Sequence, residues 1–130
     1  MVSRAKDWLR QAKRDLSHAE EDMKSTFYEW ACFSAQQASE KATKALFQHL
    51  HASAWGHSIT ALTREMMKQF PEADKLIESA KNLDKLYIQP RYPNGFDSGT
   101  PEDYFTKSDA KRAIQDARRI IDFCESRISK

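Results

Sequence analysis

The sequence predicts an all-α protein, an up-and-down bundle of four long helices and one shorter helix. Every Gly and Pro lies between positions 56 and 101, so the first 55 and the last 29 residues contain no strong backbone breaker. Val2 is the single valine, which argues against strands. A chain of 130 residues has the length of one domain, and we expect residues 1–130 to form a single one.

The first two expected helices are amphipathic. The first has Ser3 as its N-cap, and its apolar residues recur at steps of three and four: Ala5, Trp8, Leu9, Ala12, Leu16, Ala19 and Met23. The second runs from about Ser25 to His51. It places one aromatic and five small residues on one seam: Tyr28, Ala31, Ala35, Ala38, Ala42 and Ala45. Small side chains at these positions predict close approach of a neighbouring helix.

Two more helices are expected in the middle of the chain. Gly56 is the natural breaker after the second helix, and a third helix begins around Ser58. This helix ends before Pro71, because the residue before a proline is pushed out of the helical region. A fourth helix, with a regular apolar face, is expected over residues 72–87.

The C-terminal part combines a long loop with the last helix. Residues 89–106 are rich in Pro and Gly and predict a long irregular loop, a kind of connection that is usually functional or disordered. Ser108 and Asp109 are then expected to cap a helix whose apolar face runs from Ala110 to Ile128.

Composition excludes several classes of protein. A net charge of +2 does not by itself indicate a nucleic-acid partner. The chain has no apolar run of membrane-spanning length, and its first residues do not resemble a signal peptide. We therefore expect a cytoplasmic protein without membrane contact, in which Cys32 and Cys124 are reduced core thiols.

Metal and cofactor signatures are missing from the sequence. His49, His51 and His57 lie close together, but positions two apart on a helix point to different faces. Asp15 and His18 are interpreted as a surface polar pair. No Gly-rich phosphate loop or nucleophile elbow is present. The sequence thus predicts no metal site and no cofactor.

One polar cluster follows the alanine seam of the second helix. Gln37, Lys41, Lys44 and Gln48 share a stripe, and two amides with two ammonium groups on one face could hold a phosphate or an acidic partner. The alternative is a solvated helix face on which Glu40 and Lys44 form an i,i+4 pair.

The second cluster opens the long loop. Arg91 stands between Tyr87 and Tyr92, with Pro90 and Pro93 beside it. Prolines restrict the backbone, and an arginine fork next to aromatic rings suits a phosphate and a base. The alternative is that the loop merely packs over one end of the bundle.

Three segments stand out in this order along the chain: residues 30–46 (WACFSAQQASEKATKAL), residues 56–59 (GHSI) and residues 88–94 (IQPRYPN). Together they resemble the HEPN domain family, named for higher eukaryotes and prokaryotes nucleotide binding. The resemblance covers nearly the whole chain in order and spacing. It implies a helical bundle, often dimeric, which in prokaryotes is commonly paired with a small separate nucleotidyltransferase in modules like toxin–antitoxin systems.

Many members of the wider family are metal-independent ribonucleases with an Arg followed by four to six residues and a His. This sequence departs from that pattern, since Arg14 and His18 have three residues between them and no other Arg precedes a His at the required distance. What remains resembles the ligand-binding side of the family, with these candidate ligand-binding residues: Gln37, Lys41, Lys44, His57, Tyr87, Arg91 and Tyr92.

The function expected from the resemblance is a non-catalytic subunit that binds a nucleotide and pairs with a nucleotidyltransferase. In this interpretation Arg91 grips phosphate, and we expect the loop to fold back so that Arg91 meets Lys41 and Lys44. His57 would lie at the start of the third helix, where backbone N–H groups favour an anion. One alternative is a ribonuclease that uses residues outside the usual motif, such as His57 with Arg91. The other is a purely structural module, an obligate homodimer or heterodimer whose small-residue seam buries a partner helix. We expect a homodimer.

Overall fold

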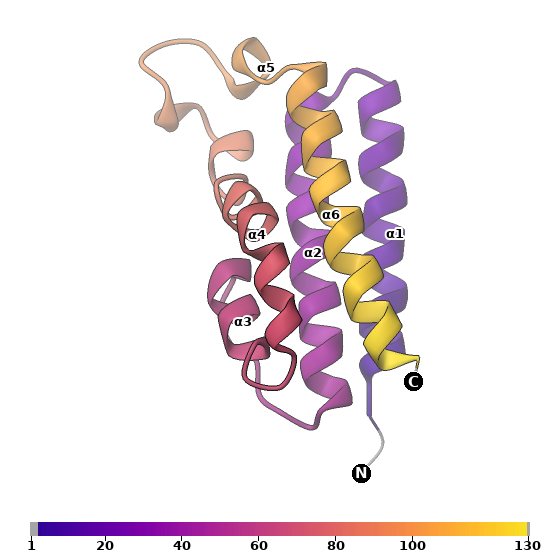
Figure 1. The fold of residues 1–130 in the computed structure, drawn as a ribbon. Coiled ribbons are helices and arrows are strands. Elements are labelled where there is room, and N and C mark those ends of the chain that lie inside the picture. Colours follow the sequence, from indigo (N-terminus) through magenta and orange to yellow (C-terminus); the bar gives the residue numbers. More distant parts are fainter. Residues whose placement is uncertain (1–2, 130) are drawn as a thin grey trace.

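The computed structural model describes residues 3–129, and within them all regular structure is helical (Figure 1). The predicted all-α bundle is confirmed. In chain order the α-helices are α1 (Ala5–Lys24), α2 (Tyr28–His49), α3 (Ile59–Met66), α4 (Ile77–Asp84), α5 (Pro101–Tyr104) and α6 (Lys107–Ile128). Three 3₁₀ turns accompany them: η1 (Pro71–Leu76), η2 (Gln89–Arg91) and η3 (Pro93–Gly95).

The bundle has three long helices rather than the expected four. The third helix stops at Met66, and Phe70 has an extended backbone (φ −127°, ψ 80°), as the proline after it requires. The expected fourth helix over residues 72–87 is divided between η1 and α4, which has only eight residues. The α3–α4 pair therefore forms a shorter layer beside the three long helices (Figure 1).

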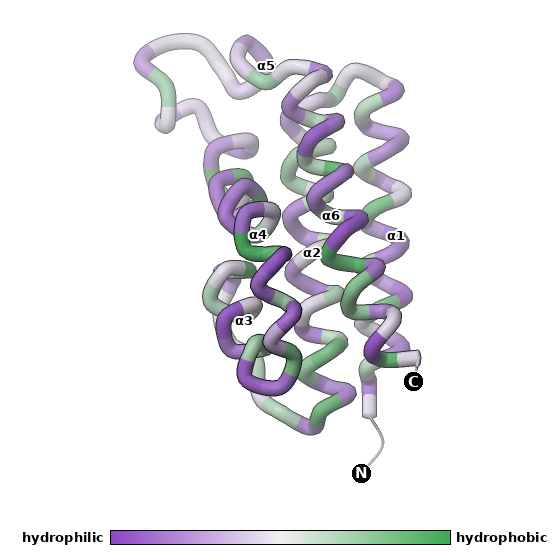
Figure 2. The backbone as a smooth tube through the Cα atoms, in the orientation of Figure 1, coloured by the Kyte–Doolittle hydropathy of each residue, from purple (hydrophilic) through white to green (hydrophobic). Residues whose placement is uncertain are grey.

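Helix α2 lies at the centre of the bundle and packs against both α1 and α6. The five alanines of its predicted seam, from Ala31 to Ala45, have no exposed surface. Figure 2 shows polar residues recurring along the outer sides of α1 and α4, with apolar residues on the intervening turns. The seam is thus confirmed, and small side chains allow α2 to be covered closely by neighbours on more than one side.

Helices α1 and α2 both end without glycine. Thr26 (φ 70°) and His51 (φ 56°) take the left-handed conformation that normally favours Gly. The N–H of Phe27 donates to the carbonyl of Asp22 (2.8 Å), and the N–H of Ala52 donates in the same way to Phe47 (2.9 Å). Hydrogen bonds of this type close the last turns, so α2 ends well before Gly56, the expected breaker.

Helix starts agree only in part with the sequence prediction. Helix α3 begins next to Ser58 as expected, and Ser58 is its N-cap, with its hydroxyl accepting from the N–H of Ala61 (3.1 Å). Helix α6 is capped by Thr106, not by Ser108 and Asp109. The Thr106 hydroxyl accepts from the Asp109 N–H (3.1 Å), and the Asp109 carboxylate accepts from the Thr106 N–H (2.9 Å). In this capping box Asp109 occupies the third helical position.

The start of α1 differs from expectation by one residue. Arg4 is its N-cap, while the Ser3 hydroxyl accepts from the N–H of Ala5 (3.1 Å). A free N–H group of the first turn is therefore satisfied by the serine, although Ser3 lies one position before the cap.

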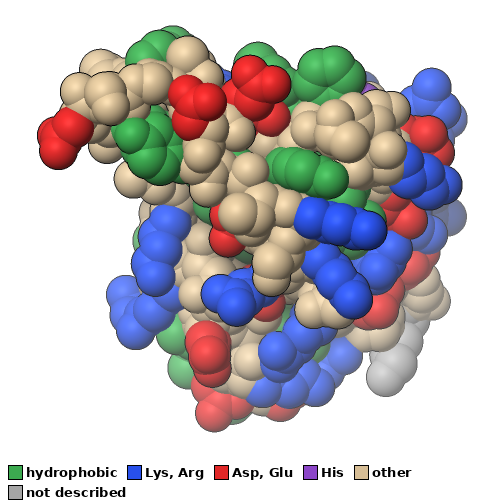
Figure 3. Space-filling model, turned by 90° about the horizontal axis from the view of Figure 1, so that it is seen from above, with side chains coloured by type: hydrophobic (Ala, Val, Ile, Leu, Met, Phe, Trp, Pro, Cys, Tyr) green, Lys and Arg blue, Asp and Glu red, His purple; other side chains and the backbone are tan. Residues whose placement is uncertain are grey.

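The expected loop over residues 89–106 contains η2, η3 and α5 and is held by aromatic contacts. Phe96 stacks on Tyr104 with ring centroids 4.3 Å apart, and the Tyr104 hydroxyl donates to the Ser98 carbonyl (2.6 Å). Gly99 has φ +78°, and a Cβ there would lie 2.6 Å from Asp103 Oδ2. Figure 3 shows this segment as a lobe, with acidic side chains on it, projecting from one corner of the bundle.

Both ends of the described chain lie at the same end of the bundle, away from the lobe (Figure 1). Cys32 and Cys124 are buried free thiols, as expected, and burial raises the pKa of each to about 12. No helix among residues 3–129 combines the length and the apolar character needed to cross a membrane.

Candidate functional site

The arginine of the predicted loop cluster lies among three aromatic rings. The guanidinium carbon of Arg91 is 4.4 Å from the ring centroid of Phe33, 4.7 Å from that of Tyr87 and 5.2 Å from that of Tyr92. Its Nε donates to the carbonyl oxygen of Tyr87 (2.7 Å). These contacts fix the plane of the guanidinium, and its terminal nitrogens have no partner among residues 3–129.

His57 connects this arginine to helix α2 through Tyr87. The rings of His57 and Tyr87 are stacked, with centroids 4.5 Å apart and planes inclined by 20°. The other side of the connection is Glu40, whose carboxylate oxygens lie 3.0 and 3.2 Å from His57 Nδ1. Tyr87 thus contacts both Arg91 and His57, and the loop before α3 is fastened to the middle of α2.

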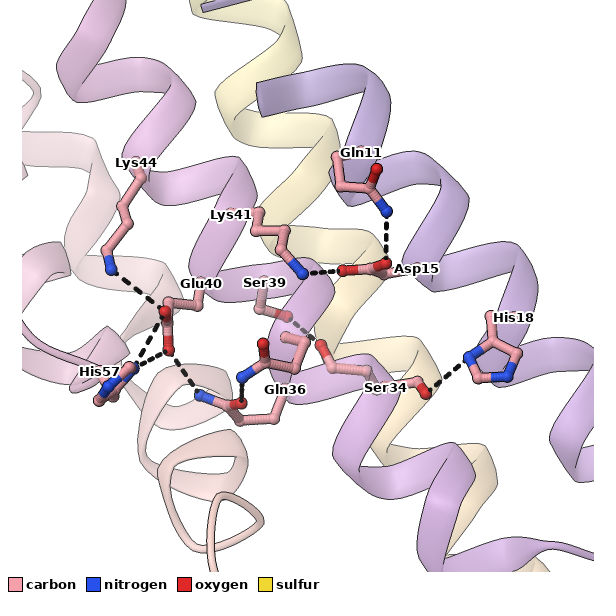
Figure 4. A network of polar contacts seen from close by, with 12 residues as sticks. Gln11, Asp15, His18, Ser34, Gln36, Ser39, Glu40, Lys41, Lys44 and His57 are labelled. Atoms are coloured by element: carbon pink, nitrogen blue, oxygen red, sulfur yellow. Dashed lines mark hydrogen bonds and ion pairs between the residues drawn. The ribbon is translucent and has the colours of Figure 1, made fainter. Parts of the chain in front are cut away.

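Glu40 is the buried centre of a polar network that reaches the surface at His57 (Figure 4). Its side chain is 8% exposed and accepts hydrogen bonds from Lys44 Nζ (3.1 Å) and Gln36 Nε2 (3.2 Å) as well as contacting His57. Gln37 in turn donates to the amide oxygen of Gln36 (2.8 Å). Lys44, Gln36 and His57 thus give the buried Glu40 carboxylate a polar partner at each of its two oxygens.

The structure brings some of the predicted residues together and separates one from them. Arg91, Tyr87, Tyr92 and His57 form one group, which we call the Arg91 cluster; Lys44 and Gln37 join it through Glu40. Lys41 instead turns to α1 and forms an ion pair with Asp15, which also accepts from Gln11 (2.9 Å; Figure 4). The expected meeting of Arg91 with Lys41 and Lys44 is therefore wrong: the contacts of Arg91 are with aromatic rings.

The expected anion site at the start of α3 is occupied from within the chain. The carboxylate of Asp84 accepts from the N–H groups of Ile59 (2.7 Å) and Thr60 (3.0 Å), and the Ser58 hydroxyl accepts from a third. These are the donors that a helix N-terminus would offer to a ligand. His57 therefore does not stand beside a free anion site at the start of α3. It contacts Glu40 and Tyr87 instead.

Sequence reasoning missed Phe33, Gln36 and the central place of Glu40. These residues share the face of α2 that carries Lys44, because positions three, four and seven apart fall on one side of a helix. That spacing is the signal that could have found them. The predicted Glu40–Lys44 pair exists, but it forms part of the network instead of being an alternative to it.

A second group of polar residues joins α1 to α2. His18 Nδ1 is 3.1 Å from Ser34 Oγ, and His18 Nε2 is 3.4 Å from Asp22 Oδ2. The expected surface pair of Asp15 and His18 is therefore wrong. Although the order Ser, His, Asp resembles that of a hydrolase, Ser34 is 7% exposed and lies inside a helix. Backbone N–H groups there are used by the helix and cannot stabilise an oxyanion.

The Arg91 cluster presents groups suited to holding an anion. A fixed guanidinium offers paired donors to a phosphate or carboxylate, and exposed Tyr92 (47%) offers a ring for stacking. Among the residues that the structure describes, no three His, Cys, Asp or Glu side chains gather as a metal site requires.

Comparison with known proteins agrees with this fold. The HEPN domain model matches residues 5–127. A crystal structure of TT1696 from Thermus thermophilus superposes with a TM-score of 0.92 at 40% identity, covering 96% of this chain and 98% of that one. An HEPN domain protein from Thermotoga maritima is also 40% identical, with a TM-score of 0.78 and coverage of 95% and 98%.

Two archaeal proteins extend the comparison. The HEPN homologue ST0689 is 34% identical, with a TM-score of 0.79 and coverage of 98% and 99%. "Putative toxin MJ1304" of Methanocaldococcus jannaschii is 25% identical over an alignment of 130 positions, which covers 93% of this chain and 86% of that protein. With a family match from the first helix to the last, the chain belongs to the HEPN domain family.

Proposed function

We propose that this HEPN protein is a non-catalytic subunit that binds a nucleotide at the Arg91 cluster and acts in a toxin–antitoxin-like module with a separate nucleotidyltransferase. The observation that carries the binding role is the fixed guanidinium of Arg91, held by the Tyr87 carbonyl with its terminal nitrogens unused by the described chain. Arg91 binds phosphate and Tyr92 stacks on the base. Lys44, Gln37 and His57 support this site through Glu40, whereas Lys41 is paired with Asp15 and lies outside the site.

Two further observations support the non-catalytic role and the module. The sequence lacks an Arg followed at the ribonuclease spacing by a His. A relative is named as a toxin, which supports membership of a two-component system. The proposal includes a homodimer as the form that meets the nucleotidyltransferase.

The binding role is tested by calorimetric titration with ATP. We expect saturable binding to the unmodified protein and a loss of at least about tenfold in affinity, ~1.4 kcal/mol, for Arg91→Ala. Arg10→Ala is the matched control, because Arg10 is an exposed arginine on the outer side of α1. Absence of binding at millimolar ATP, or an equal loss in both variants, would overturn the proposed site.

The partner and the absence of catalysis need separate experiments. Purification of the native complex from its own cells should recover a small nucleotidyltransferase; recovery of this chain alone would favour the structural dimer. Incubation with structured RNA without metal should leave the RNA intact. Cleavage that disappears in both His57→Ala and Arg91→Ala would replace the proposal with the ribonuclease alternative.

A further inference from the structure

A separate cavity of about 330 Å³ lies between α4 and α6, beneath the lobe. Its walls include Lys85 and Gln89 after α4, Phe96 and Phe105 from the lobe, and Arg112 and Asp116 from α6. The lobe joins α4 to α6 at the end of the bundle away from the two chain ends (Figure 1). The volume falls at the lower end of the range for small-molecule sites, and no lining residue belongs to the Arg91 cluster.

The two carboxylates that line the cavity are already engaged. Asp116 is buried and accepts from Ser79 Oγ (2.8 Å) and Asn82 Nδ2 (3.3 Å), one with each oxygen. Asp109 uses one oxygen in the capping box with Thr106. The acidic groups are therefore committed to holding α4 and the start of α6.

The two cations of the cavity have no such partners. Arg112 is three residues after Asp109 and four before Asp116, spacings at which ion pairs form on a helix. Neither pair lies within ion-pair distance, and within residues 3–129 neither Arg112 nor Lys85 has a salt bridge or a side-chain hydrogen bond. Two positive groups without ion-pair partners thus line the same cavity as the two carboxylates, and their N–H donors are free to bind an anion.

The lobe supplies a rigid apolar wall opposite these cations. Phe96 lies parallel to Tyr104, with planes inclined by 6°, and meets Phe105 edge to face with centroids 6.4 Å apart. Pairs with these geometries hold rings in place. A flat ring bound here would bury apolar surface against side chains that are already ordered.

From this juxtaposition we propose that the cavity binds a small aromatic anion, with its ring against Phe96 and Phe105 and its carboxylate or phosphate held by Lys85 and Arg112. The ammonium and guanidinium groups supply charge and donors, while the aromatic wall selects a planar body. This site is independent of the nucleotide site, since the two share no residue.

The test is a titration with phenyl phosphate followed by ¹H–¹⁵N NMR of the full chain. We expect shifts confined to the end of α4, the lobe and the first turns of α6. Inorganic phosphate and neutral benzyl alcohol should each bind about tenfold more weakly, because each lacks one half of the recognised chemistry. Benzoate, titrated in parallel, distinguishes a carboxylate site from a phosphate site.

Substitutions locate the charge that binds. Arg112→Gln and Lys85→Gln should each weaken phenyl phosphate binding by about fivefold. Lys111→Gln is the matched control, because Lys111 is the exposed neighbour of Arg112 outside the cavity. Arg91→Ala should leave this binding unchanged, so failure here is distinguishable from failure of the nucleotide site.

Three results would overturn the proposal. Equal binding of benzyl alcohol would show that no anion is recognised. An equal effect of Lys111→Gln and Arg112→Gln would indicate nonspecific attraction to a basic surface. Shifts that are absent up to about 10 mM ligand, or that centre on Arg91, would show that the cavity is not the binding site.

Discussion

At the scale of single residues, Asp22 shows how burial acts against a charged group. Its Oδ2 is buried and forms no hydrogen bond, although His18 Nε2 lies 3.4 Å away. Burial raises the pKa of Asp22 above its ordinary value of 3.8, and nearby His18 opposes this shift. The folded protein therefore binds this proton more tightly than the unfolded chain does.

The sign of the pH dependence follows from that difference. As the pH rises from about 4 through the raised pKa of Asp22, the unfolded chain loses its proton first and the free energy of unfolding falls. Asp22→Asn should remove this slope and raise the free energy of unfolding by ~1 kcal/mol at neutral pH. Urea unfolding at several pH values measures both effects. Asp122→Asn, at an exposed position, should keep the slope; the same slope in Asp22→Asn would contradict the assignment.

The sequence allowed the local part of the Arg91 cluster to be predicted, but not the path to α2. Tyr87, Arg91 and Tyr92 lie within six positions, so a loop of any shape keeps them near one another. Lys41 and Lys44 belong to one broad stripe, and successive residues turn by about 100° around a helix. Which edge of that stripe faces His57 and which faces Asp15 depends on tertiary packing, which helical spacing does not reveal.

At the scale of secondary-structure elements, the ends of α1 and α2 show what a search for breakers misses. Both helices end in a segment without Gly or Pro, and backbone hydrogen bonds around the left-handed residue close the last turn of each. At the end of α1 the N–H of Thr26 donates to the carbonyl of Met23 (3.2 Å), and the N–H of Phe27 donates to the carbonyl of Asp22. A β-branched residue is rarely found with positive φ, so Thr26 adopts this conformation against its own preference, in a turn closed by local backbone hydrogen bonds.

Thr26→Gly should therefore stabilise the protein. Glycine adopts this conformation freely, so the substitution relieves ~1–2 kcal/mol of backbone strain. This relief is larger than the free-energy cost of the extra entropy that glycine gives the unfolded chain. We expect a net gain of ~0.5–1 kcal/mol in the free energy of unfolding, measured by urea denaturation. The neighbouring Ser25→Gly, at φ −89°, should lose stability. A loss in Thr26→Gly as well would show that its methyl or hydroxyl group contributes more than the strain costs.

At the scale of the whole molecule, the three long helices and the α3–α4 layer differ in protection from water. After Trp30, every residue of α2 is buried or half-buried. Helix α3 has only eight residues and buries one side, through Ile59, Leu62 and Met66, while Ala61 and Arg64 face solvent. Local opening is expected where fewer apolar contacts protect the backbone.

Hydrogen exchange should resolve this difference. We expect amides in the middle of α2, residues 35–42, to exchange at least about tenfold more slowly than those in the last turn of α3. Mass spectrometry of peptic peptides gives the comparison, after correction for intrinsic rates. Equal protection in the two helices would mean that the bundle opens only by unfolding as a whole.

The all-α class and the alanine seam were predictable because they depend on spacing along a helix, which Ala31 to Ala45 repeat through most of α2. The division of residues 72–87 between η1 and α4 could not be predicted in this way, and neither could the cavity between α4 and α6. The cavity is lined by residues of α4 and the segment after it, of the lobe and of α6. Such a space is a property of three segments placed together, and no one segment carries its signature.

The common location of the two chain ends has a practical consequence for surface-based measurements. Both ends lie away from the lobe (Figure 1), and the lobe contributes Arg91 and Phe96 to the two proposed sites. A biotin or affinity tag added at either end would orient the protein on a sensor chip with both sites toward the flowing solution. Nucleotide and aromatic anion can then be injected over a single immobilised preparation, alone and together, to measure whether one ligand alters the response to the other.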